Sequence, residues 1–434
     1  MITALVLLVL CVLAGIIWIN LKWGVVLLVI VSLLNTFLEG LLPVEADVVV
    51  GLIVVTRFLP QLFLHHRWKR SVLDAPVLIL VLAGVVTLAG LAFKGSEFFG
   101  ETATGVLGLI LVMAMSLVVF QIIKEERMIQ QVLQVFALTV TAMALLSIVL
   151  LLLGVSTVRV GQAEITVFHR WGGIQVRLGG FYEQPNTFAT PLVLALPIAI
   201  AFSLIGKSRL RRVLWAAAAG ICAAGLLLSQ SRSGVLGALL GVLIMGLVLV
   251  KSGKIVSLLH KGFVLTFLVL IVLGATNMIK PVIERLSVEY QMLQLIGVQE
   301  PSRFVIWREA ILLAYQNPLG YGAETKHLVG KSLGLDQKSL HNVFIDYLTS
   351  FGWLGFVGIF ILAVTPVRRL WRFICSTTDA EWKVISAGLL AGLVGFWVHN
   401  LAHSMIYWVA VWLYFVGVAA TLRLGYISKK GVSL

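Results

Sequence analysis

Two arginines, a tryptophan and a histidine are the side chains of this sequence most able to do chemistry. Arg232 lies in a tight Ser-Arg-Ser-Gly turn between two apolar runs, with no acidic residue beside it. Arg303 and Trp307 are four residues apart, so they share one face of a predicted helix. His341 and Asn342 stand where a polar loop re-enters an apolar run. Guanidinium groups suit phosphate because they stay charged and bind in a bidentate way, and an imidazole can take a proton from a hydroxyl near neutral pH.

Each of these residues also has a purely structural interpretation. An arginine beside a tryptophan can be a snorkelling anchor at a membrane surface, and spacing alone favours neither interpretation for Arg303 and Trp307. From spacing alone, a single interfacial histidine such as His341 is more often an amphipathic filler than a base. For Arg232 the functional interpretation is favoured, because an ionisable residue between apolar spans marks a functional site by default. Other arginines of the polar segments more simply pair with nearby acids, namely Arg159, Arg285 and Arg308.

The elements that must position these residues are membrane-spanning helices. The chain has 434 residues, of which 60% are hydrophobic and only 12% are charged, against about 25% charged residues in an ordinary soluble domain. A soluble globule of this composition would lack the polar side chains to cover its surface. A soluble enzyme, a disordered chain and a nucleic-acid-binding module are therefore excluded, despite the net charge of +14. The composition predicts an all-α polytopic integral membrane protein.

Thirteen apolar runs are candidate spans, since a transmembrane helix needs about 20 mostly apolar residues. They lie near 2–19, 24–42, 48–64, 75–93, 103–123, 129–155, 187–205, 213–228, 235–250, 262–278, 342–364, 384–402 and 406–422. Two are weak, because 48–64 contains Arg57 and Pro60 and 213–228 is short. We therefore predict twelve or thirteen spans within one helical domain, 1–434.

Clusters of Lys and Arg indicate the orientation, because they concentrate in cytoplasmic loops. The strongest clusters lie at 65–70, 207–212, 368–372 and 423–430. With these inside, residues 156–186 form a smaller outer loop and residues 279–341 form the large one. The large loop holds seven Lys or Arg residues against six acids. Basic residues on the outer side run against the positive-inside bias and suggest an anionic ligand there.

The large outer loop is predicted to contain short helices. Apolar residues recur at three- and four-residue steps over 281–298, which indicates an amphipathic helix at the membrane surface. A second helical stretch covers 303–315. The breaker run Asn-Pro-Leu-Gly-Tyr-Gly at 317–322 ends it.

Four segments together resemble the O-antigen ligase and O-antigen polymerase superfamily of bacterial envelope enzymes. They are Phe-Tyr-Glu-Gln-Pro-Asn-Thr-Phe-Ala at 181–189, Ser-Arg-Ser-Gly at 231–234, Arg303 and Trp307 followed by the run at 317–322, and His341 with Asn342. The first 150 residues match only as generic apolar spans. The resemblance implies a glycosyltransferase of the bacterial inner membrane with its active site facing the periplasm. Such enzymes move a glycan from undecaprenyl pyrophosphate to an acceptor hydroxyl, and the chain is most similar to the O-antigen ligases, whose acceptor is lipid A–core oligosaccharide.

The resemblance also implies roles for individual residues. Arg232 and Arg303 would clamp phosphates, and His341 would be the catalytic base. Further residues of the outer segments are expected to bind substrate, namely Arg170, Arg177, Gln184, Asn186, Trp307, Asn342 and Tyr321. The expected partners are the undecaprenyl-pyrophosphate-linked glycan donor, a lipid A–core or other glycan acceptor, and membrane lipids, with no nucleic acid.

A metal ion and a cofactor are not expected. The leaving pyrophosphate needs its charge stabilised, and soluble sugar-nucleotide enzymes often use a divalent metal held by an Asp-x-Asp motif, which this sequence lacks. Arginines are the remaining electrophiles, so we expect a metal-independent, inverting displacement. Cys11, Cys222 and Cys375 all lie in or beside apolar runs. His399 and His403 have the spacing of a ligand pair, but the sequence shows no third ligand beside them.

Three alternatives to the ligase remain. A polymerase and a protein O-oligosaccharyltransferase differ from it in the acceptor, which one sequence does not reveal. A transporter of lipid-linked glycan would also need many spans and a basic outer site. Such a transporter would predict internal repeats and interrupted helices near the membrane midplane, and neither is clear in the sequence. Its polar residues are instead concentrated in one large outer loop.

Overall fold

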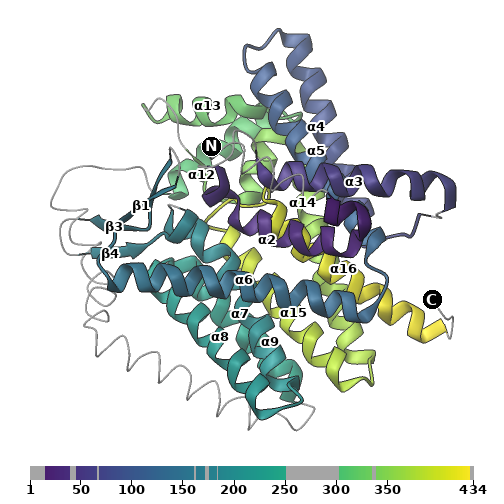
Figure 1. Cartoon of the computed structure of the whole chain (residues 1–434). Coiled ribbons are helices and arrows are strands. Elements are labelled where there is room, and N and C mark those ends of the chain that lie inside the picture. Colours follow the sequence, from purple (N-terminus) through teal and green to yellow (C-terminus); the bar gives the residue numbers. More distant parts are fainter. Residues whose placement is uncertain are drawn as a thin grey trace.

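The computed structural model describes residues 15–39, 45–65, 68–160, 163–171, 175–182, 184–250, 303–334 and 339–430. These residues form mainly helices, which pack into one bundle (Figure 1). The helices are α2 (Leu21–Glu39), α3 (Ala46–His65), α4 (Asp74–Lys94), α5 (Phe99–Ile122), α6 (Glu126–Leu152), α7 (Pro185–Ile205), α8 (Arg209–Ser229), α9 (Arg232–Val250), α12 (Arg303–Gln316), α13 (Thr325–Ser332), α14 (Val343–Ser376), α15 (Ala380–Asn400) and α16 (Val409–Lys430). The predicted span at 262–278 and the predicted amphipathic helix at 281–298 lie outside the described residues.

Among the described residues, eight helices are long and apolar enough to cross a membrane, namely α4 to α9, α14 and α15. This confirms the prediction of an all-α polytopic membrane protein. The described apolar stretches of α2 and α16 are shorter, Leu21–Asn35 and Val409–Leu424. The total of twelve or thirteen spans stays a prediction, because the first predicted span, 2–19, lies largely outside the described residues.

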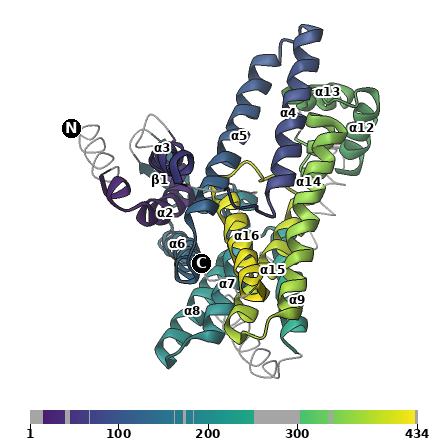
Figure 2. The same ribbon diagram turned by 90° about the vertical axis from the view of Figure 1, so that its right-hand side faces the viewer.

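Helices α7 and α15 form the centre of the bundle, with 78% and 83% of their most apolar stretches buried. Helix α9 packs against α15 (Figure 2) almost backbone to backbone. A methyl group added at Gly237 would meet the carbonyl of Gly395, and one added at Gly241 would meet the carbonyl of Ala391. Small residues permit this close approach, as in many membrane helix pairs. The seam fixes the start of α9 relative to the end of α15.

Helix α14 is broken near its start, where Gly352 has a φ of 65°. The breaker run at 317–322 docks into the break. The backbone N–H of Trp353 donates to the Pro318 carbonyl at 3.1 Å, and that of Tyr321 donates to the Thr349 carbonyl at 2.9 Å. No side chain fits here, because a methyl group added at Gly352 would meet the Pro318 carbonyl. The run that ends α12 thus anchors the outer segment to α14.

The segment between α6 and α7 contains two short β-hairpins that the sequence analysis did not predict. Strand β1 (Thr157–Val160) pairs with β2 (Ala163–Thr166), and β3 (Phe168–Trp171) pairs with β4 (Gln175–Leu178), both antiparallel. A 3₁₀ turn, η1 (Gly180–Tyr182), then leads into α7. The hairpins are small additions at one side of the helical bundle (Figure 1).

Candidate active site

Arg232 stands at the first position of α9, exposed, directly after the turn that ends α8. The turn is tight because Gln230 adopts a left-handed conformation with a φ of 52°. Two hydrogen bonds attach strand β4 to this turn. The Gln230 side-chain amide donates to the Val176 carbonyl at 3.0 Å, and Arg177 Nε donates to the Ser229 carbonyl at 3.4 Å. The structure therefore brings Arg177, a predicted substrate contact, to the turn that carries Arg232.

Ser233, the next residue of α9, joins this turn to α15. Its hydroxyl lies 2.9 Å from Nδ1 of the buried His399, and His399 Nε2 lies 3.0 Å from the Asn186 carbonyl. A carbonyl oxygen only accepts, so Nε2 must carry the proton and Nδ1 must accept from Ser233. This chain of contacts ties α9, α15 and the start of α7 together. Asn186 is a predicted substrate contact, and its carbonyl already accepts a hydrogen bond from His399 within the protein.

Arg303 and Trp307 both reach from α12 to loops beside the bundle. Arg303 Nη1 donates to the Ala402 carbonyl at 3.4 Å, and Trp307 Nε1 donates to the Leu340 carbonyl at 2.9 Å. The same side of α12 packs on α13 and α14 through the buried Ile306 and neighbouring apolar residues, and Trp307 itself packs against this cluster. The four-residue spacing correctly predicted that the two side chains share a face.

His341 follows directly on the Leu340 carbonyl and has a φ of 49°, which is rare for a residue other than glycine. Such a conformation costs about 1–2 kcal/mol and persists where neighbours impose it. Asn342 imposes it from one side, since its buried side-chain oxygen caps α14 by accepting from the N–H groups of Phe344 and Ile345 at 3.0 and 3.2 Å. Asn342 therefore positions the backbone of His341.

His403 packs directly against His341 and is a residue whose place in this cluster the sequence analysis missed. Its ring lies nearly parallel to that of His341, with centroids 6.4 Å apart, and 5.5 Å from that of His399. The side chain is 8% exposed, and neither ring nitrogen has a hydrogen-bond partner among the described residues. Burial is the main reason that the pKa of His403 falls to about 3, and repulsion by the neighbouring basic groups of His399, His341 and Arg303 lowers it further. The ring is therefore neutral at ordinary pH.

The only sequence signal for His403 is its four-residue distance from His399, a spacing that also suits a pair of metal ligands. Among the described residues, no three His, Cys, Asp or Glu side chains are arranged to hold a metal ion. Ser404 fixes the loop further by donating to Asp346 Oδ2 at 2.8 Å. The loop after α15 is thus held from α12 and α14 at the point where His403 meets His341.

The remaining predicted substrate contacts are less closely connected to this cluster. Arg170 lies in β3, where it pairs with Val176 of β4. Gln184 is exposed just before α7. Tyr321 lines a cavity of about 370 Å³ beside the loop between α4 and α5, together with Asn317 and Glu324. Burial and the negative charge of Glu324 raise the pKa of Tyr321.

The long apolar helices define a multi-pass membrane protein, and these contacts define a cluster of basic and histidine residues where several of its helix ends meet. Residues 217–360, about a third of the chain, match the family model described as O-Antigen ligase, a segment that contains Arg232, Arg303 and His341. No curated protein matches the chain. The match confirms the resemblance to the O-antigen ligase superfamily, a family of membrane glycosyltransferases of the ligase and polymerase type.

Proposed function

We propose that this protein transfers a glycan from undecaprenyl pyrophosphate to an acceptor hydroxyl at the periplasmic face of the bacterial inner membrane. We further propose that it is an O-antigen ligase with lipid A–core oligosaccharide as acceptor. The family match supports the reaction class, and the clusters of Lys and Arg in alternate loops support the orientation.

One observation carries the proposal, namely that three distant motifs meet at the loop after α15. Arg303 donates to the carbonyl of Ala402, the next residue, His403, stacks on His341, and His399 at the end of α15 bonds to Ser233 beside Arg232. The guanidinium of Arg303 and the ring of His341 thus approach the same short loop, and the Arg232 turn is joined to it through the end of α15. A lipid pyrophosphate and a sugar hydroxyl would need this pairing of cations with a base.

In the proposed reaction, His341 takes the proton of the acceptor hydroxyl as its oxygen attacks the anomeric carbon. The new C–O bond forms as the bond to pyrophosphate breaks on the opposite side, so the anomeric configuration inverts. The departing undecaprenyl pyrophosphate keeps the electron pair, and Arg232 and Arg303 stabilise its developing charge. The neutral ring of His403 positions His341 by packing against it.

The test is glycan transfer by purified variants with an undecaprenyl-pyrophosphate-linked donor, in the presence of EDTA. Arg232→Lys and Arg303→Lys keep the charge but lose the bidentate fork, so each is expected to lower the rate on the order of 10²–10³-fold. His341→Ala is expected to lose about 10²–10⁴-fold while retaining donor binding. Arg308→Lys, on the exposed side of α12, is the matched control and keeps full activity.

Several outcomes would contradict the proposal. Full activity of both lysine variants would remove the phosphate clamp, and retained transfer by His341→Ala would remove the base. Activity of the wild-type protein that disappears with EDTA would refute the metal-independent scheme. Parallel assays with lipid A–core, a lipid-linked repeat and a protein as acceptor separate the ligase from a polymerase or a protein O-oligosaccharyltransferase.

A further inference from the structure

A cavity of about 280 Å³, lined by both charged and apolar side chains, lies at the end of α5 remote from the breaker run at 317–322. The start of α5 lies at the end of that run, because Thr102 Oγ1 accepts from the N–H of Ala323, the residue that follows it, at 2.9 Å. The end of α5, Ile122, lies 20 residues beyond Thr102, which corresponds to about 30 Å. The side chains that give the cavity its polarity are Asn20, Lys22, Arg57, Lys124 and Glu125. We call it the Lys124 cavity.

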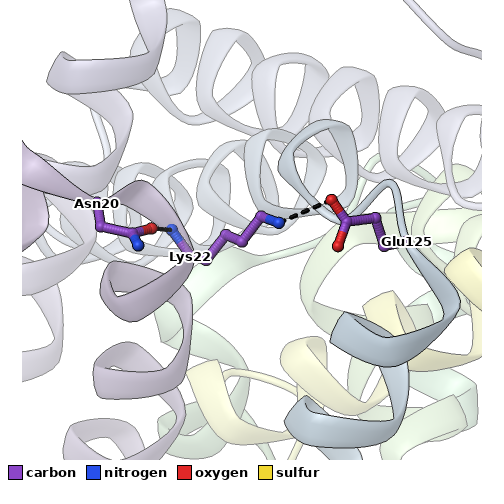
Figure 3. A network of polar contacts seen from close by, with 3 residues as sticks. All are labelled: Asn20, Lys22 and Glu125. Atoms are coloured by element: carbon purple, nitrogen blue, oxygen red, sulfur yellow. Dashed lines mark hydrogen bonds and ion pairs between the residues drawn. The ribbon is translucent and has the colours of Figure 1, made fainter.

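Positive charge exceeds negative charge in the Lys124 cavity. Glu125, its one acidic side chain, forms an ion pair with Lys22 at 2.7 Å, and the Asn20 side-chain oxygen accepts from the Lys22 N–H (Figure 3). The Lys22 charge is therefore compensated. Arg57 and Lys124 are not matched by a second acid in the lining, so the cavity has a net charge of two positive units (three basic side chains less one acidic).

Further cations lie close by and add to the positive potential. The backbone of Lys69 is fixed by Gln121 of α5, which donates to the Lys69 carbonyl at 2.8 Å and accepts from its N–H at 3.1 Å. Burial and the positive charges of Arg423 and Lys124 lower the pKa of Lys69. Such crowding of like charges is costly, and an anion bound among them would relieve it.

The surroundings of the cavity place it at the depth of lipid headgroups. Trp18 and Trp23, on either side of Asn20, are 58% and 60% exposed, as is typical of aromatic residues at a membrane interface. Arg57 lies over the Trp18 ring at 5.6 Å and donates to the Trp18 carbonyl at 3.1 Å. These contacts hold the guanidinium at the level of the tryptophans.

A second cavity of about 350 Å³ adjoins the first across the ion pair of Lys22 and Glu125. It continues along apolar residues of α2 and α6, including Val26 and Val135. Its lining also includes Arg127 and Gln131. A charged pocket that leads into a mainly apolar groove between helices matches a phosphate group with an attached acyl chain. Free phosphate has no acyl chain that could occupy the groove.

We propose that the Lys124 cavity binds the phosphate group of an anionic phospholipid, with Arg57 and Lys124 contacting the phosphate and the α2–α6 groove taking an acyl chain. The site lies at the other end of the bundle from His341 and does not depend on the proposed reaction. Clusters of basic residues beside membrane helices attract anionic lipid at a gain of roughly fivefold in affinity per cation.

The experiment measures lipid binding to the purified full-length protein by native mass spectrometry, with phosphatidylglycerol, phosphatidylcholine and inorganic phosphate as probes. Phosphatidylglycerol is expected to bind more tightly than phosphatidylcholine, and inorganic phosphate is not expected to displace it. Arg57→Gln with Lys124→Gln is expected to weaken phosphatidylglycerol binding by about 25-fold, two cations at roughly fivefold each. The control, Arg209→Gln with Arg211→Gln, removes two exposed charges from the start of α8 and leaves the affinity unchanged.

A third variant serves as a control for misfolding. Glu125→Gln removes the acid and releases the Lys22 charge, so it is expected to raise the affinity for phosphatidylglycerol by about fivefold, a gain that a misfolded protein would not produce. Equal losses in the two double variants would overturn the proposal in favour of diffuse surface charge. Displacement of the lipid by an equal concentration of inorganic phosphate would overturn it in favour of a free-anion site.

Discussion

The buried ring of His403 makes the stability of the protein depend on pH. Its pKa is about 3 in the folded protein, against 6.5 for an ordinary histidine. Since the folded pKa is depressed, the unfolded chain binds the proton first as the pH falls. The folded state therefore has its full advantage above about pH 6.5 and loses it progressively down to about pH 3. Between pH 7 and pH 5 this one group is expected to remove about 2 kcal/mol from the free energy of unfolding.

The assay is chemical unfolding in mild detergent, followed by circular dichroism at pH 7 and at pH 5, for the wild-type protein and for His403→Gln. Glutamine does not titrate in this range, so the variant lacks this contribution whatever its absolute stability. Other titrating groups act equally in both proteins and cancel in the comparison. The free energy of unfolding of the wild type should fall by about 2 kcal/mol more than that of the variant. An equal fall in both proteins would refute the account of a buried, neutral His403.

Three further predictions follow from the packing. Gly241→Ala places a methyl group against a carbonyl of α15 and is expected to cost about 1–3 kcal/mol of stability, whereas Gly246→Ala on the same helix meets open space and should be neutral in the same thermal unfolding assay. Trp307→Phe keeps an aromatic side chain but loses the hydrogen bond to the Leu340 carbonyl, so the free energy of unfolding should fall by about 1 kcal/mol. No fall would show that the bond is unimportant. A cysteine at the exposed Ser332 of α13 should react with an impermeant thiol reagent in intact spheroplasts, and labelling only after permeabilisation would reverse the proposed orientation.

Helix positions were largely predictable, because a membrane span needs a long apolar run and little else. The runs at 187–205 and 384–402 correspond to α7 (Pro185–Ile205) and α15 (Ala380–Asn400). The helix at 303–315 and its end at 317–322 were also predicted, since proline and glycine leave a distinct local signal. The two hairpins were not, because four-residue strands are too short for a clear alternation of apolar and polar residues.

The site was predictable only as a set of separate motifs. Arg232, Arg303 and His341 were identified one by one, and their roles remain predictions. The contact between Ser233 and His399 joins residues 166 positions apart, and no periodicity in the sequence indicates so distant a contact. The sequence marks His403 only as half of a possible ligand pair with His399, and its place beside His341 depends on the return of the chain after α15, which only the structure shows.

The break in α14 has a consequence for the order in which the protein is assembled. A break inside an apolar helix leaves backbone groups that need partners, and the Pro318 carbonyl and the Tyr321 N–H supply two of them. The same breaker run also contacts α4, through the hydrogen bond from Thr87 to the Leu319 carbonyl at 2.7 Å. Because synthesis proceeds from the N-terminus, the run can meet α4 as soon as it emerges but must wait for α14. The Arg303 helix, which also donates to the Ala402 carbonyl after α15, can therefore reach its final place only after α14 and α15 have entered the membrane.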